Sequence, residues 1–218
     1  VILQEVTATR AIDLGTNTAG QLGLTSGEIN TITTTGVLQV GNATAGAINV
    51  SAAIAPTGAT KLDLESGSTV GGASTITTTD LAIRSVGAVS LNAANNVTNL
   101  AANVSGAGNA FSYNDANALV VGTADGLNGV TTSGGVVTVT TTSGSLDINQ
   151  NVAAGAAAVN LTAGGAGSVL TNAAAVTGNA ATLSADDMVL AGGTINTGAG
   201  RVILQEVTAT RAIDLGTN

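Results

Sequence analysis

The chain has no cysteine and no histidine, one proline, and only 1% aromatic residues. Without cysteine, disulfide bonds and thiolate metal sites are excluded. Large aromatic rings normally supply much of the bulk of a globular core, so their scarcity argues against a thick one. The 44% of residues that are apolar are mostly Ala, Val, Leu and Ile. Such side chains suit a narrow core.

Charge is also scarce, because charged residues make up 8% of the chain and the net charge is −8. Nucleic-acid binding is disfavoured, since the five basic residues form no stripe that could neutralise phosphates. A polybasic membrane anchor is excluded for the same reason. The uncharged stretch 148–185 is broken by Asn and Gly, so we expect no membrane insertion of this segment.

The most informative feature is a repeat. The sequence VILQEVTATRAIDLGTN runs from Val1 to Asn17 and returns, letter for letter, from Val202 to Asn218, an offset of 201 residues. A chain that restarts its own sequence is typical of a tandem array, whose units stack into an elongated object. We therefore divide the chain into one repeat unit, residues 1–201, and the start of the next identical repeat, residues 202–218. The expected partners are further copies of the repeat, joined head to tail.

Within the repeat, short triplets with an aliphatic residue on each side of a central, often polar residue recur throughout. Alternation of this kind places the two aliphatic side chains on one face of a strand and the central residue on the other. Each triplet therefore predicts a short strand with one buried face. The triplets are Ile12–Leu14, Leu22–Leu24, Leu38–Val40, Ile48–Val50, Leu62–Leu64, Leu81–Ile83, Val89–Leu91, Val137–Val139, Leu146–Ile148, Val159–Leu161 and Ile213–Leu215.

The spacing of the triplets favours an all-β, right-handed parallel β-helix. Two similar blocks, one with Leu38–Val40 and Ile48–Val50 and the other with Leu81–Ile83 and Val89–Leu91, are 41 to 44 residues apart. That distance predicts two coils of about 20 residues each, and hence about ten coils in the 201-residue repeat. A sandwich or barrel also has short strands, but the exact repeat favours a solenoid. If each repeat holds a whole number of coils, its copies present the same faces.

Several longer stretches resemble one family. The runs Ala11–Gly27, Leu38–Ala53, Ala93–Gly122, Gly129–Asn149 and Arg211–Asn218 look like the repeats of very large filamentous-haemagglutinin-like bacterial surface proteins. This resemblance implies a secreted right-handed parallel β-helix that serves as an adhesin shaft or surface fibre. It further implies an extracellular or cell-surface location and contact with glycans on host or neighbouring cells.

Acidic residues are the first candidates for a functional site. The pair Asp186-Asp187 would fit glycoside hydrolysis, which uses two carboxylates, but adjacent residues in a strand point to opposite faces. Asp115, Asp125 and Asp147 could bind calcium together with that pair only if the coils stacked them, and no calcium-loop motif is present. We therefore predict no catalytic, metal-binding or cofactor-binding residue and treat these carboxylates as surface charge.

Two polar groups have alternative interpretations. The threonine tracts 31–35, 75–79 and 138–142 would suit an ice-binding face only with Thr on most coils, so outward strand-forming residues are the preferred interpretation. The asparagines of the region 95–117 would form either an amide ladder along the axis or isolated turn residues. They are Asn95, Asn96, Asn99, Asn103, Asn109, Asn114 and Asn117.

Three hypotheses about function follow from these observations. The first is a non-catalytic structural segment of a secreted bacterial filament or adhesin shaft. The second is a module that binds a carbohydrate or a cell receptor along one polar face. The third is a polysaccharide-active β-helix enzyme, for which Asp186 would be required.

Overall fold

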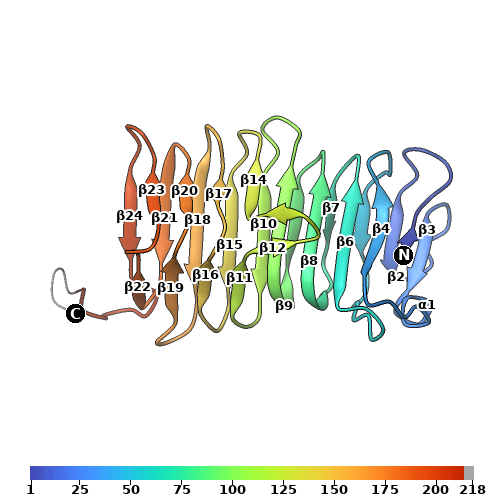
Figure 1. Cartoon of the computed structure of the whole chain (residues 1–218), viewed down its shortest axis with the longest axis horizontal. Coiled ribbons are helices and arrows are strands. Elements are labelled where there is room, and N and C mark those ends of the chain that lie inside the picture. Colours follow the sequence, from blue (N-terminus) through green and yellow to red (C-terminus); the bar gives the residue numbers. More distant parts are fainter. Residues whose placement is uncertain (214–218) are drawn as a thin grey trace.

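The alternating triplets form parallel strands that stack into one continuous solenoid. The computed structural model describes residues 1–213, of which the long axis is shown in Figure 1. The chain is 51% strand and 2% helix and makes about 8 turns. No helix among the described residues is long and apolar enough to cross a membrane. The fold class predicted from the sequence, an all-β parallel β-helix, is confirmed.

The strands form three ladders, which we call faces I, II and III. Face I contains β3 (Leu22–Thr25), β2 (Ile12–Gly15), β5 (Ile48–Val50), β7 (Val70–Gly72), the start of β9 (Val89–Val104), β10 (Phe111–Asp115), β15 (Val137–Thr141), β18 (Ala158–Ala163), β21 (Ala180–Ser184) and β24 (Val202–Gln205). Faces II and III share four long strands, which cross both faces: β4 (Val37–Asn42), β6 (Lys61–Ser66), β8 (Thr77–Ser85) and β9. Face II contains the first part of β4, β6 and β8, the middle of β9, and then β11 (Leu119–Val121), β16 (Leu146–Ile148), β19 (Val169–Asn172) and β22 (Asp187–Val189). Face III contains β1 (Ile2–Leu3), the last part of β4, β6, β8 and β9, and then β14 (Val130–Thr132), β17 (Val152–Ala153), β20 (Ala175–Thr177) and β23 (Thr194–Asn196).

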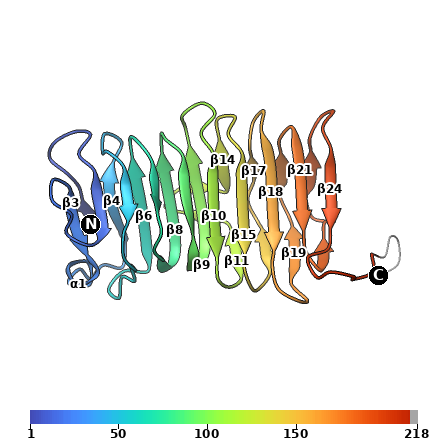
Figure 2. The same cartoon turned by 180° about the vertical axis from the view of Figure 1, so that it is seen from behind.

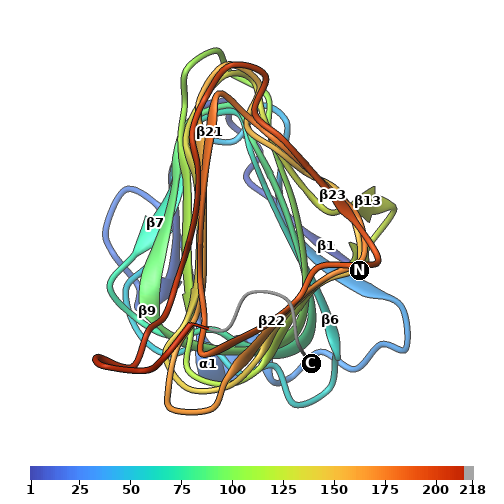
Figure 3. The ribbon, with the colours of Figure 1, turned by 90° about the vertical axis from the view of Figure 1, so that its left-hand side faces the viewer.

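The three faces enclose a triangular cross-section. In Figure 3 face I lies on the left, face II at the bottom and face III on the right. Seen from this C-terminal end, the chain descends face I, crosses face II and rises along face III as it advances toward the viewer. The winding is therefore right-handed. Figure 2 shows the face I ladder from behind, with its strands side by side along the whole shaft.

The ladders confirm the triplets as strands and show the two-coil spacing. All the triplets from Ile12–Leu14 to Val159–Leu161 lie in strands, whereas Ile213 lies in none and the rest of its triplet is outside the described residues. Leu38 pairs with Leu62 and Leu62 with Leu81. The two similar blocks are therefore two coils apart, as predicted.

The predicted number of about ten coils is wrong, because several coils are longer than 20 residues. Ile12 pairs with Ile48, 36 positions further on, since the first coil also contains β3 and the short helix α1 (Ser26–Ile29). Phe111 pairs with Val137, 26 positions on, because a hairpin of β12 (Thr123–Ala124) and β13 (Leu127–Asn128) is inserted between the two strands. With about 8 turns, one repeat advances by roughly 40 Å at ~4.8 Å per coil.

Columns of aliphatic side chains fill the interior along the axis. On face I, Leu91, Tyr113, Val139, Leu161 and Leu183 are ladder neighbours, and each is at most 1% exposed. The only two aromatic residues of the chain, Phe111 and Tyr113, both point into this core from β10. The narrow interior thus needs large rings at one level only.

Small residues let successive coils approach closely at the corner between faces III and I. A Cβ atom at Gly135 would lie 1.8 Å from the carbonyl oxygen of Asn109, and one at Gly200 would lie 1.5 Å from that of Asn179. The hydroxyl of Thr197, three positions before Gly200, donates to the Gly200 carbonyl at 2.9 Å. Ser66, Ser85 and Thr132 bond turn carbonyls at the same corner. These buried hydroxyls supply hydrogen bonds that the turns would otherwise lack.

The two ends of the solenoid differ. At the first end β3 pairs with the outer edge of β2, and Leu22, Leu24 and the buried Ile29 of α1 pack against the core. At the other end all four residues of β24 are exposed. Val202 is 42% and Leu204 46% exposed, although both continue the inward-facing columns. In the described part of the chain, β3 and α1 cover the N-terminal coil, and no strand covers the outer edge of β24.

The expectation that the two copies of the repeated sequence present the same face is not met. Ile2 pairs with Gln39 on face III, whereas its equivalent Ile203 pairs with Thr182 on face I. The first copy can pair only with the coil that follows it, and the second only with the coil that precedes it. The repeat therefore does not contain a whole number of coils.

The interior columns predict that substituting an inward residue lowers the stability of the protein much more than substituting an outward one. We expect Leu161→Ala to lower the free energy of unfolding by about 2–5 kcal/mol, because it removes a fully buried side chain between two rungs. Thr140→Ala, an outward residue of the adjacent strand β15, should change it by less than about 0.5 kcal/mol. Urea unfolding followed by circular dichroism measures both, and equal effects would contradict the assigned register.

Candidate functional site

The acidic pair Asp186-Asp187 lies at the corner that follows β21. Asp186 accepts hydrogen bonds from the backbone N–H of Thr208 at 2.8 Å and from its hydroxyl at 2.6 Å, and Arg211 lies 3.6 Å away. These hydrogen bonds, with that of the Gly167 N–H, lower the pKa of Asp186 well below its usual range. Asp187 is exposed and accepts from the Met188 N–H. Asp186 thus anchors the start of the second copy.

The other acidic candidates do not meet. Asp115 is fully buried on face I, Asp147 lies on β16 of face II, and Asp125 is exposed at the tip of the β12–β13 hairpin. Within residues 1–213, no three acidic groups are close enough to hold one metal ion. The structure therefore does not bring the sequence candidates for calcium together.

Asp115 has a structural role that the sequence did not reveal. Its carboxylate accepts hydrogen bonds from the Tyr113 hydroxyl at 3.0 Å and from the backbone N–H groups of Val97 and Asn117 at 2.9 and 3.0 Å. Burial raises the pKa of Asp115, although these hydrogen bonds act in the opposite direction. Burial and the neighbouring carboxylate likewise raise the pKa of Tyr113. The hydrogen bonds of the Asp115 carboxylate hold the corner that follows β10 in place.

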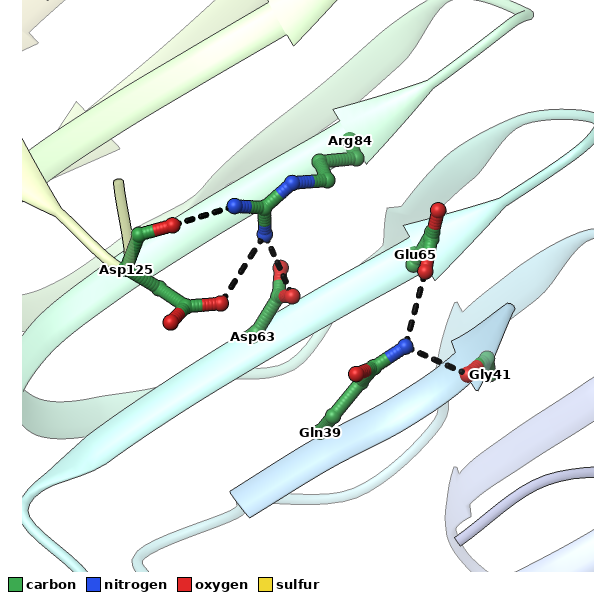
Figure 4. Close-up of polar contacts among 6 residues, drawn as sticks. All are labelled: Gln39, Gly41, Asp63, Glu65, Arg84 and Asp125. Carbon is green, nitrogen blue, oxygen red and sulfur yellow. Dashed lines mark hydrogen bonds and ion pairs between the residues drawn. The ribbon is translucent and has the colours of Figure 1, made fainter. Parts of the chain in front are cut away.

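A charged cluster on face III includes one of the acidic candidates, Asp125. Figure 4 shows Arg84 of β8 between Asp63 of β6 and Asp125 of the hairpin. One nitrogen of Arg84 contacts the carboxylates of both Asp63 and Asp125, the latter at 3.2 Å, and the other nitrogen bonds the Asp125 carbonyl. On the adjacent rung the Gln39 amide donates to Glu65 at 2.7 Å. Arg84 thereby connects the shaft to the only antiparallel element among the described strands.

The hairpin covers a small apolar patch on the outer surface of face III. Ala82 and Ala101, which point outward from β8 and β9, are buried under Ala124 and Leu127. Asp125 at the tip has φ 42° and is followed by Gly126 with φ 76°, the left-handed conformation of tight hairpin turns. Burial under this hairpin raises the pKa of Asp63 to about 7, even though Arg84 favours its ionised form. The cluster and the patch together hold the hairpin against the shaft.

An uncharged polar strip runs along the outside of face I. It contains one residue from each of five successive rungs, which are ladder neighbours at the ~4.8 Å rung spacing. They are Ser90, Ser112, Thr138, Asn160 and Thr182. Of the three threonine tracts, only 138–142 contributes to the strip, while Thr31–Thr35 precedes β4 outside any strand. Threonine thus occupies two of the five rungs.

The asparagines of the region 95–117 do not form an amide ladder. One amide-to-amide bond joins Asn117 to Asn96 at 3.1 Å. Asn95 is fully buried, and its amide donates to the carbonyls of Leu91, Ala93 and Asn114. Asn109 likewise bonds the Val86 carbonyl. Five of the seven asparagines lie within β9 or β10 and only Asn109 and Asn117 lie outside strands, so isolated turn residues do not describe the group either.

Comparison with protein-family models, with curated proteins and with solved structures found no match to this chain. The resemblance to filamentous-haemagglutinin-like repeats therefore stays a prediction.

The contacts of Arg84 predict that removing its guanidinium group lowers the stability of the protein. Arg84→Met should destabilise the protein by about 1–3 kcal/mol, because the guanidinium contacts to Asp63 and Asp125 are lost and the buried Asp63 carboxyl, whose pKa is already about 7, takes up a proton at neutral pH. The double variant Asp63→Asn with Arg84→Met should recover part of that loss, since no buried carboxyl then has to be protonated. Arg201→Met, at an exposed arginine, is the control. Thermal unfolding measures all three, and an Arg84→Met protein as stable as the control would contradict the account.

Proposed function

We propose that the chain is a repeat segment of a non-catalytic shaft of a secreted filament or adhesin on a bacterial surface. The observation that carries the proposal is the open C-terminal coil. Among residues 1–213, β24 pairs only with β21, and its inward residues Val202 and Leu204 are about half exposed. Exposed edges with apolar side chains are sites for pairing with further strands.

The repeated sequence identifies what completes this coil. Residues 202–218 are the start of the same sequence again, so a further copy of the repeat would supply the next coils. Continuous ladders and core columns would then run from one repeat into the next. Because stability in such stacks grows with the number of neighbouring interfaces, a long array would be stiff and stable without disulfides. The part of the proposal that places the shaft outside a bacterial cell rests on the resemblance of the sequence to filamentous-haemagglutinin-like repeats.

Electron microscopy of chains with one, two and three copies of residues 1–201 tests the shaft. We expect thin rods that lengthen by roughly 40 Å per copy, the advance of about eight rungs. The midpoint of urea unfolding should rise with copy number, because each copy adds an interface. Separate compact lobes of constant size, or an unchanged midpoint, would contradict the proposal.

The polar strip of face I favours a second function, the binding of a neutral carbohydrate along the shaft. The strip offers hydroxyl and amide groups at every rung between Ser90 and Thr182 and carries no charge. A ligand without charge avoids repulsion from a chain of net charge −8.

A glycan array tests the strip. If the unmodified protein binds neutral polysaccharides, Thr138→Glu should abolish that binding, because the new side chain places an unpaired carboxylate within the strip. Thr171→Glu, at a half-buried residue of β19 on face II, is the matched control and should retain binding. Either no saturable binding by the unmodified protein, or equal loss in both variants, would eliminate this second function.

A further inference from the structure

The repeated segment VILQ has two different neighbours in the two copies. In the first copy Ile2 and Leu3 pair with Gln39 and Val40 of β4, the coil that follows. In the second copy Val202 to Gln205 pair with Ala181 to Ser184 of β21, the coil that precedes. Ile2 and Leu3 therefore pair with a strand of face III, and their equivalents Ile203 and Leu204 pair with a strand of face I.

Both pairings orient the side chains in the same way. Leu3 is opposite the buried Val40, and its equivalent Leu204 is opposite the buried Leu183. Ile2 is opposite Gln39, and Ile203 is opposite Thr182, both of which are on the outer side. Because a shift of one residue would exchange inside and outside, this agreement is required for one strand to make both pairings.

The two pairings also use opposite edges of the segment. The amino group of Val1 donates to the Val37 carbonyl at 2.8 Å, and the Val1 carbonyl accepts from the Gln39 N–H at 2.8 Å, both toward the following coil. In the second copy, Arg201 and Gln205 accept from Ala181 at 3.0 Å and from Ala185 at 3.1 Å, both toward the preceding coil. Alternate residues of a parallel strand bond to opposite neighbours. The groups used by one copy are therefore left free by the other.

The turn that follows the VILQ segment also has the same conformation but different partners in the two copies. Thr9 has φ 66° and its equivalent Thr210 has φ 69°, and the bonds from Arg10 to Thr7 and from Arg211 to Thr208 are both 3.2 Å. In the first copy the Thr9 N–H bonds Thr44 of the following coil. In the second copy Thr208 bonds Asp186 of the preceding coil. The turn has one conformation and two separate sets of partners.

We propose that, in the tandem array, each VILQ segment is a single shared strand between β21 of one repeat and β4 of the next. This inference rests on the proposed function, because it requires the repeats to continue as a shaft. β21 lies on face I and β4 on face III, so each repeat begins one face further round the triangle. A repeat is then about eight turns plus about a third of a turn, and three repeats restore the starting orientation.

The terminal coils fit this arrangement, with one rearrangement. Rotation by one face places Ile12 of the next repeat beside face II of the preceding one. Its equivalent Ile213 already lines a cavity together with Met188 of β22. β3, however, pairs with the edge of β2 that would face the preceding repeat. In an array Leu22–Thr25 must leave that edge, so β3 is an end cap of the isolated unit.

A chain of three copies of residues 1–201 tests the rotation. Because the sequence lacks cysteine, Val136→Cys in each copy gives one gold-labelled site per repeat at an exposed position beside β15. Cryo-electron microscopy should place successive labels about a third of a turn apart around the axis. Asp147→Cys, on face II, is the control and should show the same rotation from a starting position one face away. In the unlabelled chain the β12–β13 hairpin should project in three directions.

The outcomes separate the two proposals. A straight rod whose labels and hairpins all lie on one side would overturn the shared strand but leave the shaft intact. Separate lobes would overturn the shaft itself. Amide hydrogen exchange supplies an independent readout. The N–H groups of Leu22–Thr25 should be protected in a single copy and exchange faster in the inner copies of the array, and unchanged protection there would also overturn the inference.

Discussion

Backbone hydrogen bonding between successive rungs is the interaction on which the rest of this structure depends. Parallel strands in register at ~4.8 Å bring equivalent residues of every coil into columns along the axis. A column must then be aliphatic where it faces inward and small where corners approach, as at Gly135 and Gly200. The composition of the chain, rich in Val, Leu, Thr and Gly and almost free of rings, follows from this constraint.

The same constraint explains which features could be predicted from the sequence. An aliphatic-x-aliphatic triplet encodes its own strand and buried face, so triplets such as Leu38–Val40 and Val159–Leu161 were predicted correctly. The number of coils depends on how much chain each corner holds. The triplet Leu22–Leu24 looks like any other strand in the sequence, although it pairs with the outer edge of β2 and adds no coil to the shaft. The hairpin Thr123–Asn128 has no periodic signal that would show which coil it lengthens. The predicted ten coils were therefore too many.

The polar contacts were missed for a related reason. Arg84 and Asp63 are 21 positions apart, and only the register of β6 and β8 brings them together. Asp186 was considered as part of an acidic pair, but its partners Thr208 and Arg211 belong to the second copy of the repeated sequence. The corner hydroxyls had a usable signal, since Thr132 and Thr197 each stand three positions before a glycine whose carbonyl they bond. That pattern identifies corners once a coil length is known.

The two copies of the repeated sequence connect the fold to the proposed function. One segment has two complementary edges, one inward face and one turn conformation, which are the properties needed to join units into an uninterrupted shaft. A remainder of about a third of a turn per repeat would distribute the hairpin and the polar strip around the fibre instead of along one side. Such a fibre would present the same surfaces in every direction, which suits contact with other surfaces.

The register of the face I ladder determines every other contact described above, and it can be measured as distances between pairs of spin labels. Labels at Thr138→Cys and Asn160→Cys lie on adjacent rungs, whereas labels at Ser90→Cys and Thr182→Cys lie four rungs, or roughly 19 Å, apart. Stacked rungs in this register should give strong dipolar broadening of the electron paramagnetic resonance spectrum for the first pair and little for the second. Absence of broadening for Thr138 and Asn160 would contradict it.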